Sequence, residues 1–301
     1  MKKIIYNIIK FPLKLILIRT PLINILKNRF KYQNSLSYKG KIWFYLDIFF
    51  QREYFIKLKD KKKIRELTDL VLSGEEGKKW AQYYYEKHFK SLDGLKKKII
   101  GNIYANEAMP IFEKMINFIK SNNLSEDKNT YIIQLGSSSG RDLEFFLNIF
   151  PKLNYISTDV NEEILDFQKE KYNYLNIRYF KCYAEDINKC IEFFDLFDKN
   201  IIFFSNSSLQ YVNPFFLKEF FENLKNYKKF NLFLNEPVNL SFISDSKLIS
   251  EYRGNISFSH KYDEYANNSN LKVIEKEKIK PYPKGDANYL TGHSYLHISN
   301  N

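Results

Sequence analysis

A turn bracketed by two glycines, and a carboxylate that follows the next strand-like run, carry most of the chemistry that this sequence supports. Gly136 and Gly140 enclose three serines directly after an apolar run that ends at Leu135. Asp159 follows a second apolar run, residues 155–158. Backbone N–H groups at such a turn face polar or anionic ligand groups, and a carboxylate about 20 residues further on can hold ribose hydroxyls. The spacing therefore predicts a nucleotide-cofactor site.

The residues around this turn predict the elements that must position it. Residues 131–135 are typical of a buried parallel strand, because they form an almost uninterrupted apolar run that begins with β-formers. Residues 141–150 place apolar side chains three and four positions apart, which is the spacing of a helix lying on a sheet. Ligands of such sheets bind outside the carboxyl ends of the strands. We therefore expect the turn and Asp159 to meet at that edge.

The turn departs from two well-known phosphate-binding patterns. A dinucleotide fingerprint that starts at Gly136 needs glycines where the sequence has Ser138 and Arg141, and the Gly-Lys-Ser/Thr ending of a phosphate-binding loop is missing. The segment instead resembles motif I of the seven-stranded, Rossmann-like S-adenosylmethionine-dependent methyltransferases, an acid followed by alternating glycines. Here Gln134 stands in place of the opening acid, and Ser138 in place of the central glycine.

This resemblance implies where the cofactor, S-adenosyl-L-methionine, would bind. Asp159 matches the acid that holds the cofactor ribose, and residues 183–187 are similar to the loop that holds the adenine. Residues 206–212 are similar to the segment that faces the methionine moiety and the methyl acceptor. The predicted cofactor-binding residues are Gln134, Gly136, Ser137, Ser138, Gly140, Asp159, Val160, Ala184, Glu185, Asp186 and Asn206.

The remaining apolar runs follow in the order that the resemblance requires. Residues 176–182, 200–205 and 230–234 are predicted strands, the last ending at Asn235-Glu236-Pro237. Two further strand-like runs, 271–279 and 294–298, fit the extra antiparallel strand of the family. The resemblance thus implies an α/β fold with a doubly wound, mostly parallel seven-stranded sheet, an antiparallel last strand and a helical N-terminal extension.

Charge divides the chain unevenly. The net charge is +12, but residues 1–46 hold ten Lys or Arg and no acid. Residues 1–32 contain two acid-free amphipathic patterns, which are typical of helices in the interface of anionic membranes, although the same apolar faces could pack on the protein itself. The domains predicted are a basic amphipathic segment (1–32), a helical extension or lid (33–120) and the S-adenosylmethionine-binding methyltransferase domain (121–301).

The apolar stretches, cysteines and histidines bear on membrane spanning, metal binding and location. Charges interrupt every apolar stretch before the roughly 18 residues that a membrane-spanning helix needs. Cys182 and Cys190 are the only cysteines, and neither they nor the four histidines have the spacing of a metal site. We predict no metal. A cytoplasmic location is expected, with attachment to the inner membrane face if residues 1–32 bind lipid.

The chemistry of methyl transfer suggests which residues to consider as catalytic. A hydroxyl acceptor needs a general base, because an alcohol is a poor nucleophile until its proton is removed. His293, in a predicted turn before the last strand, is the first candidate, Tyr211 the second and His260 the third. An exposed turn histidine is the competing interpretation of His293.

We expect an S-adenosylmethionine-dependent methyltransferase that acts by O-methylation on a glycan or lipid-linked acceptor at a membrane surface. Methylation of RNA or protein, with the basic N-terminus contacting phosphates, is one alternative, although nucleic acid is the less favoured partner. A cofactor-binding scaffold without turnover is the other, since Gln134 and Ser138 depart from the family pattern.

Overall fold

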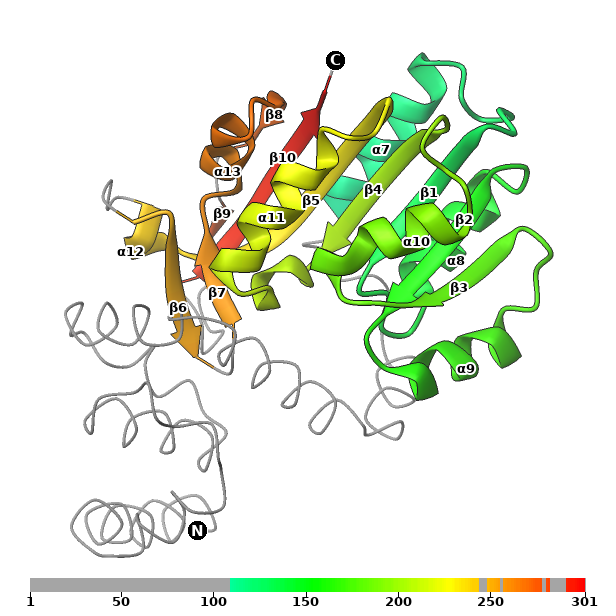
Figure 1. Ribbon diagram of the computed structural model, residues 1–301, viewed down its shortest axis with the longest axis horizontal. Helices are drawn as coiled ribbons and strands as arrows, with labels where there is room; N and C mark the ends of the chain where they lie inside the picture. The colour runs from blue at the N-terminus through cyan, green and yellow to red at the C-terminus, as the bar shows by residue number, and fades with distance from the viewer. Residues whose placement is uncertain (1–108, 244–247, 255–256, 278–279, 282–290, 301) are drawn as a thin grey trace, which may run out of the picture.

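One mixed β-sheet organises the part of the chain that the computed structural model describes (Figure 1). The described residues are 109–243, 248–254, 257–277, 280–281 and 291–300, so the predicted segment 1–32 and most of the predicted extension lie outside them. Seven strands follow in the order β3-β2-β1-β4-β5-β10-β8, and the short β9 pairs beside β10. The strands are β1 Thr130–Leu135, β2 Asn154–Asp159, β3 Ile177–Lys181, β4 Asn200–Asn206, β5 Lys229–Asn239, β6 Ser250–Gly254, β7 Ser257–His260, β8 Lys272–Lys276, β9 Lys280–Pro281 and β10 Thr291–Ser299.

The direction of the strands confirms the predicted fold class. Strands β1 to β5 are parallel to their neighbours, whereas β10 runs antiparallel to both β5 and β8. Helices cover both faces, as a doubly wound fold requires, with α10 and α11 on one face and α7 and α8 on the other (Figure 1). The helices are α7 Met109–Ser121, α8 Arg141–Ile149, α9 Glu162–Lys171, α10 Ile187–Phe193, α11 Pro214–Leu224, α12 Leu240–Ile243 and α13 Tyr262–Asn268, with 3₁₀ turns η1 Ala184–Asp186 and η2 Leu209–Tyr211.

Alternating side chains divide the core into two layers. In β4, Ile201 and Phe203 pack in the layer of α10 and α11, whereas Ile202 and Phe204 pack in the layer of α7 and α8. A strand buried on both faces reads as a continuous apolar run. This explains why the sequence pattern located β1, β2 and β4 to within one residue at each end.

Helix α7 belongs to the same packed unit as the sheet. Its residues Ile111, Phe112, Met115 and Ile119 are all fully buried. Phe112 meets Phe146 of α8 edge to face, with ring centroids 5.3 Å apart. The helix covers the back of the sheet and lies almost entirely before residue 121, where the sequence analysis placed the start of the methyltransferase domain.

The structure corrects the predicted end of β5. The strand does not stop at Asn235-Glu236-Pro237 but continues to Asn239. Its parallel neighbour β4 ends opposite Asn235, so Pro237 pairs only with β10. A strand tolerates proline where one of its sides has no ladder partner. The β6–β7 hairpin was also not predicted, because its two short strands carry mostly polar residues.

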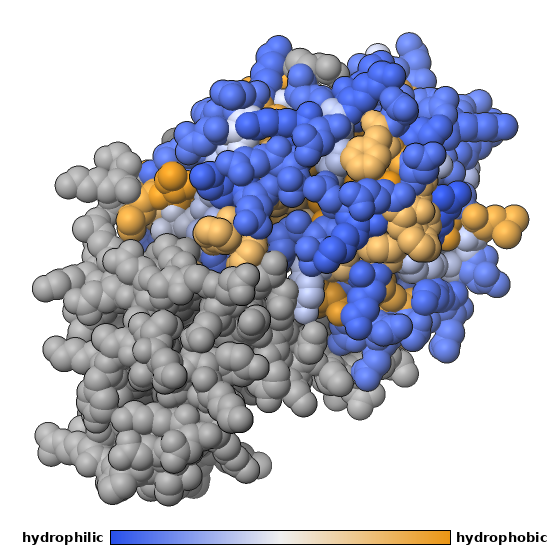
Figure 2. Space-filling model, in the orientation of Figure 1, coloured by the Kyte–Doolittle hydropathy of each residue, from blue (hydrophilic) through white to orange (hydrophobic). Residues whose placement is uncertain are grey.

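The hydrophobic residues on the surface are dispersed. Figure 2 shows them as separate groups on a largely hydrophilic face. The exposed side chains of Leu175, Phe193 and Phe215 come from the α9–β3 loop, α10 and α11 respectively. Within the described residues, no helix is both long and apolar enough to cross a membrane.

His297 is an uncharged part of the core. Its ring stacks on Phe233 with centroids 4.2 Å apart, and Phe118 meets it edge on. The Nε2 atom lies 2.9 Å from the Asn231 side-chain oxygen. Burial lowers the pKa of His297 to about 4. The folded protein therefore holds this ring neutral at a pH where the unfolded chain protonates it.

We predict that this histidine makes the fold sensitive to mild acid. An unfolded histidine titrates near pH 6.5, so between about pH 6.5 and about pH 4 the unfolded state binds more protons. Stability should therefore fall as pH falls through this window, by up to about 3 kcal/mol for a single group. Urea unfolding of the wild type and of His297→Gln across the window measures this. The variant should lose less stability on acidification, and equal losses would exclude the histidine as the cause.

Candidate functional site

The loop between β1 and α8 depends on its two glycines. Gly136 has φ +70° and Gly140 has φ +74°, in the left-handed region that glycine enters readily. A Cβ atom on Gly136 would lie 2.6 Å from Ser208 Oγ, and one on Gly140 would lie 2.9 Å from the Gln168 side chain. Ser138, in place of the family's central glycine, also has a positive φ of 50°. The loop thus keeps a glycine-like conformation at a position where the sequence has serine.

Asp159, at the end of β2, holds this loop. Its Oδ2 accepts a hydrogen bond from the Ser138 N–H at 2.9 Å, and its Oδ1 accepts one from the Asn161 N–H at 3.0 Å. Burial raises the pKa of the Asp159 carboxyl, while the N–H groups of Asn161, Ser138 and Val160 act in the opposite direction. A carboxylate has about four acceptor positions. Asp159 therefore fixes the loop and still has an acceptor position for a ligand hydroxyl.

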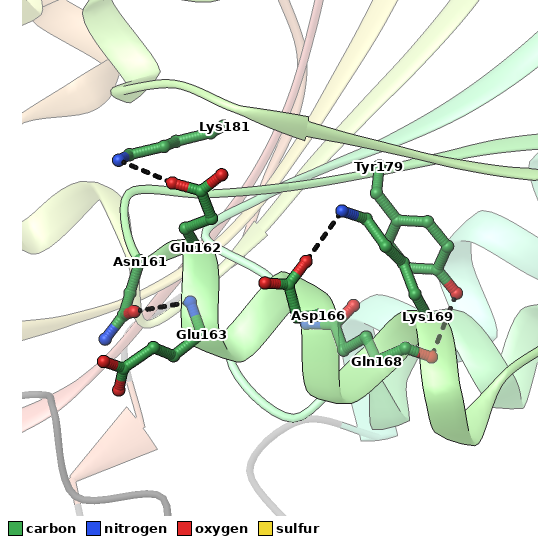
Figure 3. Close-up of polar contacts among 8 residues, drawn as sticks. All are labelled: Asn161, Glu162, Glu163, Asp166, Gln168, Lys169, Tyr179 and Lys181. Carbon is green, nitrogen blue, oxygen red and sulfur yellow. Dashed lines mark hydrogen bonds and ion pairs between the residues drawn. The ribbon is translucent and has the colours of Figure 1, made fainter.

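Helix α9 supports the loop from the side of β2 and β3. The Asn161 side chain caps the helix by accepting a hydrogen bond from the Glu163 N–H at 3.0 Å (Figure 3). The Tyr179 hydroxyl of β3 donates to the Gln168 backbone oxygen at 3.3 Å (Figure 3). Ion pairs on the outside of α9, such as Lys181 with Glu162 at 3.3 Å, are exposed and contribute little to stability.

Gln168 connects α9 directly to the loop. Its Nε2 donates to Ser137 Oγ at 2.9 Å and to the Ser138 backbone oxygen at 2.7 Å. Its Oε1 accepts from the Ser157 hydroxyl of β2 at 2.6 Å. The sequence analysis missed Gln168, because a single glutamine in a helix has no motif around it.

A second buried carboxylate shapes the segment after β4. Glu236 of β5 is fully buried. It accepts hydrogen bonds from the Ser205 hydroxyl at 2.5 Å and from the backbone N–H groups of Ser208, Leu209 and Gln210 at 3.0 to 3.1 Å. Burial raises the pKa of Glu236, and these four donors oppose the shift. Its four hydrogen bonds therefore hold η2 and the residue before it against the end of β4.

Polar side chains connect β1, α8, β4 and β5 on the face that carries α7 and α8. Asp142 Oδ2 accepts hydrogen bonds from Gln134 Nε2 at 3.3 Å and from Asn206 Nδ2 at 3.1 Å. Asn235 Nδ2 in turn donates to Asn206 Oδ1 at 2.9 Å. Burial raises the pKa of the Asp142 carboxyl. The sequence analysis missed Asp142 and Asn235, since an acid in the first turn of a helix is an ordinary surface feature.

The predicted cofactor-binding residues all lie near the carboxyl ends of four neighbouring strands. Gln134 and the glycine loop belong to β1 and its end, Asp159 and Val160 to the end of β2, and Asn206 to the end of β4. The half-buried residues 184–186 form η1 after β3, where Asp186 pairs with the exposed Lys189 at 3.3 Å. Tyr211 ends η2 beyond β4 and is half-buried.

The structure corrects the local setting of His293. This residue lies within β10 rather than in a turn, because β5 continues past its predicted end and pairs with a longer β10. It lies opposite Pro237 and is half-buried. Since Thr291 faces Asn239, this part of β10 is on the carboxyl-edge side, as predicted. His260 is buried in β7, with its Nδ1 2.7 Å from Ser250 Oγ.

Metal-binding geometry is not found in the described part of the chain, which holds no group of three or more His, Cys, Asp or Glu that could bind a metal ion. Cys182 and Cys190 are free, buried thiols. Burial raises the pKa of both thiols.

Comparisons with known proteins give similarities of fold. No protein-family model and no curated protein sequence matches the chain. A methyltransferase from Leishmania major is similar, with 15% identity, coverage of 76% of this chain and 90% of that one, and a TM-score of 0.49. A Burkholderia thailandensis 1,6-didemethyltoxoflavin-N1-methyltransferase with bound S-adenosylhomocysteine has 10% identity, coverage of 74% of this chain and 89% of that one, and a TM-score of 0.49. A Synechocystis magnesium protoporphyrin IX methyltransferase has 8% identity, coverage of 74% of this chain and 100% of that one, and a TM-score of 0.48.

The strand order defines the class of fold. An antiparallel β10 inserted between β5 and β8 distinguishes this sheet from that of the dinucleotide dehydrogenases. The chain therefore has the seven-stranded fold of the Rossmann-like S-adenosylmethionine-dependent methyltransferases. The three solved structures named above share at most 15% sequence identity with this chain, so their similarity concerns the fold alone.

We predict that Gly136→Ala destabilises the protein by about 1 to 3 kcal/mol, because it adds a clash to an unfavourable positive φ. Ser208→Gly removes both side-chain atoms that the new Cβ would meet. The double variant should therefore recover part of the loss. Chemical denaturation of the wild type, both single variants and the double variant measures the coupling. Simple additivity of the two single effects would show that Ser208 is not what excludes a side chain at position 136.

Proposed function

We propose that this protein is an S-adenosylmethionine-dependent methyltransferase. The observation that carries the proposal is the internal hydrogen bonding of the glycine loop. The N–H groups of Ser137, Ser138 and Gly140 donate to Thr158 O, Asp159 Oδ2 and Ser137 O. They are therefore turned away from any ligand, whereas a phosphate site needs such groups directed outward. A nucleoside cofactor without phosphates suits this loop better than a dinucleotide.

The neighbouring side chains fit the nucleoside part of such a cofactor. Asp159 has an acceptor position left for a ribose hydroxyl. Asn161 Nδ2 is a buried donor without a hydrogen-bond partner among the described residues, although its Oδ1 caps α9. A buried, unpaired donor beside Asp159 is consistent with a ligand acceptor at this place. Residues 184–186, after β3, would then lie along the adenine.

The protein's part in methyl transfer is mainly to position the reactants. When bound, the cofactor supplies an electrophilic methyl group on a sulfonium. The segment after β4, held by Glu236, would place Asn206 and Tyr211 beside the acceptor. Correct placement of two reactants accounts for much of the rate enhancement in such displacements.

We predict that S-adenosylhomocysteine binds the full-length protein and that Asp159→Asn weakens binding by about 1 to 3 kcal/mol, through lost charge-assisted hydrogen bonds. Asp166→Asn is the matched control, because Asp166 is an exposed acid of α9 that pairs only with Lys169 among the described residues. Isothermal titration calorimetry measures both. Tight binding of NAD together with no heat from S-adenosylhomocysteine would refute the proposed function.

The methyl acceptor is proposed from the composition of the N-terminal segment. We infer O-methylation of a glycan or lipid-linked hydroxyl at a membrane surface, with residues 1–32 attaching the protein to anionic lipid. The basic, acid-free composition of that segment supports this. His293, on the carboxyl-edge side of β10, is the proposed general base, with Tyr211 as the second candidate. RNA or protein as acceptor, and a scaffold without turnover, remain the alternatives.

We predict that the methyl label of tritiated S-adenosylmethionine passes into the glycan or lipid fraction of a cell extract. His293→Ala should lower the initial rate by roughly 10² to 10⁴, because a general base acts in the transition state, while S-adenosylhomocysteine affinity stays unchanged. Label in RNA or protein would establish the alternative acceptor. Label in no fraction, with the cofactor bound, would indicate a scaffold. Unchanged transfer by the variant would remove His293 from the mechanism.

A further inference from the structure

Gln134 presents a buried oxygen that no described residue satisfies. The side chain is 3% exposed, and its Oε1 has no hydrogen-bond partner among the described residues. Its Nε2 donates to Asp142, which fixes the orientation of the amide, because the opposite orientation would set an oxygen against a carboxylate. An unsatisfied buried acceptor costs about 1 to 3 kcal/mol. Such a group at a site edge points to a ligand that donates hydrogen.

Asp142 adds a negative charge beside this oxygen. Both hydrogen bonds that it receives, from Gln134 and from Asn206, end on Oδ2, so Oδ1 has no donor among the described residues. Asn206 cannot reverse its amide without losing the bond from Asn235. The two amides thus hold one carboxylate oxygen and leave the other available. A free carboxylate oxygen next to an unpaired amide oxygen favours a cationic donor.

Two other carboxylates at this edge, Glu236 and Asp159, already accept hydrogen bonds that hold the protein's own loops. Glu236 receives four hydrogen bonds and is fully buried. Asp159 holds the glycine loop at the end of β2. Asp142 accepts hydrogen bonds from residues at the carboxyl ends of both β1 and β4, Gln134 and Asn206.

The strand order gives the direction in which a bound nucleoside would extend. The sites proposed above place adenine after β3 and ribose after β2. The next positions along the edge are those of β1 and β4, where Gln134, Asp142 and Asn206 lie. An amino-acid tail attached to the ribose would therefore reach this group. The tail of S-adenosylmethionine carries a primary ammonium with three N–H donors.

We propose that Gln134 Oε1 and Asp142 Oδ1 together bind the α-ammonium of the cofactor, so that Asp142, on α8, supplies the charge that Gln134 lacks. This inference rests on the proposed function. It assigns to a helix residue the recognition of the amino-acid tail, and it accounts for a glutamine at a position where the resemblance leads one to expect an acid.

The test compares two ligands that differ in the tail. S-adenosylhomocysteine carries the ammonium, and 5′-methylthioadenosine has the same nucleoside without the amino-acid part. Calorimetry on the full-length protein should show that Asp142→Asn weakens S-adenosylhomocysteine binding by about tenfold to a hundredfold, the effect of losing one charged hydrogen bond. Binding of 5′-methylthioadenosine should stay within about twofold, since nothing that it contacts has changed.

A double variant that exchanges the acid and the amide tests whether the loss of binding is merely structural. Gln134→Glu combined with Asp142→Asn moves the acid to β1 and keeps one carboxylate and one amide in the pair. This variant should restore S-adenosylhomocysteine affinity to within about threefold of the wild type. Asp166→Asn removes an equal charge from exposed α9 and should change neither ligand.

The outcomes separate this inference from the proposed function. If Asp142→Asn weakens both ligands equally, or changes neither, or if the swap fails to recover affinity, the ammonium assignment is wrong. If the wild type binds neither nucleoside, the proposed function itself is wrong. Thermal unfolding of each variant shows whether lost binding reflects lost folding.

Discussion

The hydrogen bonds between Asp159 and the backbone of its neighbours are the constraint on which the site depends. A loop with three positive-φ residues in five, two of them glycine, has high conformational freedom and needs an external restraint. The Asp159 carboxylate provides it by accepting the N–H groups of Ser138 and Asn161, and Gln168 binds the same loop from α9. The same bonding turns the N–H groups of Ser137, Ser138 and Gly140 inward, away from a ligand. A restraint that is needed for folding therefore also limits which cofactors fit.

Strand β5 similarly restrains the segment that follows β4. Consecutive residues Asn235 and Glu236 point to opposite faces of the sheet, as residues of a strand must. Asn235 orients Asn206, and Glu236 holds η2. The segment after β4, including Ser207 with φ 62°, thus takes its conformation from its neighbouring strand. Burying a carboxylate is costly unless it is hydrogen-bonded, and the four donors to Glu236 meet this requirement.

The sequence predicted those parts of the fold in which local pattern and burial agree. Strands β1, β2 and β4 are buried on both faces, so their apolar runs mark their limits. The end of β5 was not predictable, since Pro237 reads as a stop unless one knows that β4 has already ended beside it. The same error placed His293 in a turn.

Within the site, residues in motifs were located and their supporting residues were not. Asp159 has the spacing that a ribose-binding acid requires. Asp142, Gln168 and Glu236 become significant only through partners 8 to 64 positions away. Such contacts follow from the way in which the sheet brings distant segments together, and no local pattern encodes them.

The central claim is that the edge formed by β3, β2, β1 and β4 binds S-adenosylmethionine through its nucleoside and amino-acid parts. A crystal structure of the full-length protein with S-adenosylhomocysteine tests this most directly. The account predicts ribose hydroxyls within hydrogen-bonding distance of Asp159, adenine along residues 184–186, and the ammonium between Gln134 and Asp142. A ligand bound at the opposite edge of the sheet, or one whose ribose does not contact Asp159, would contradict it.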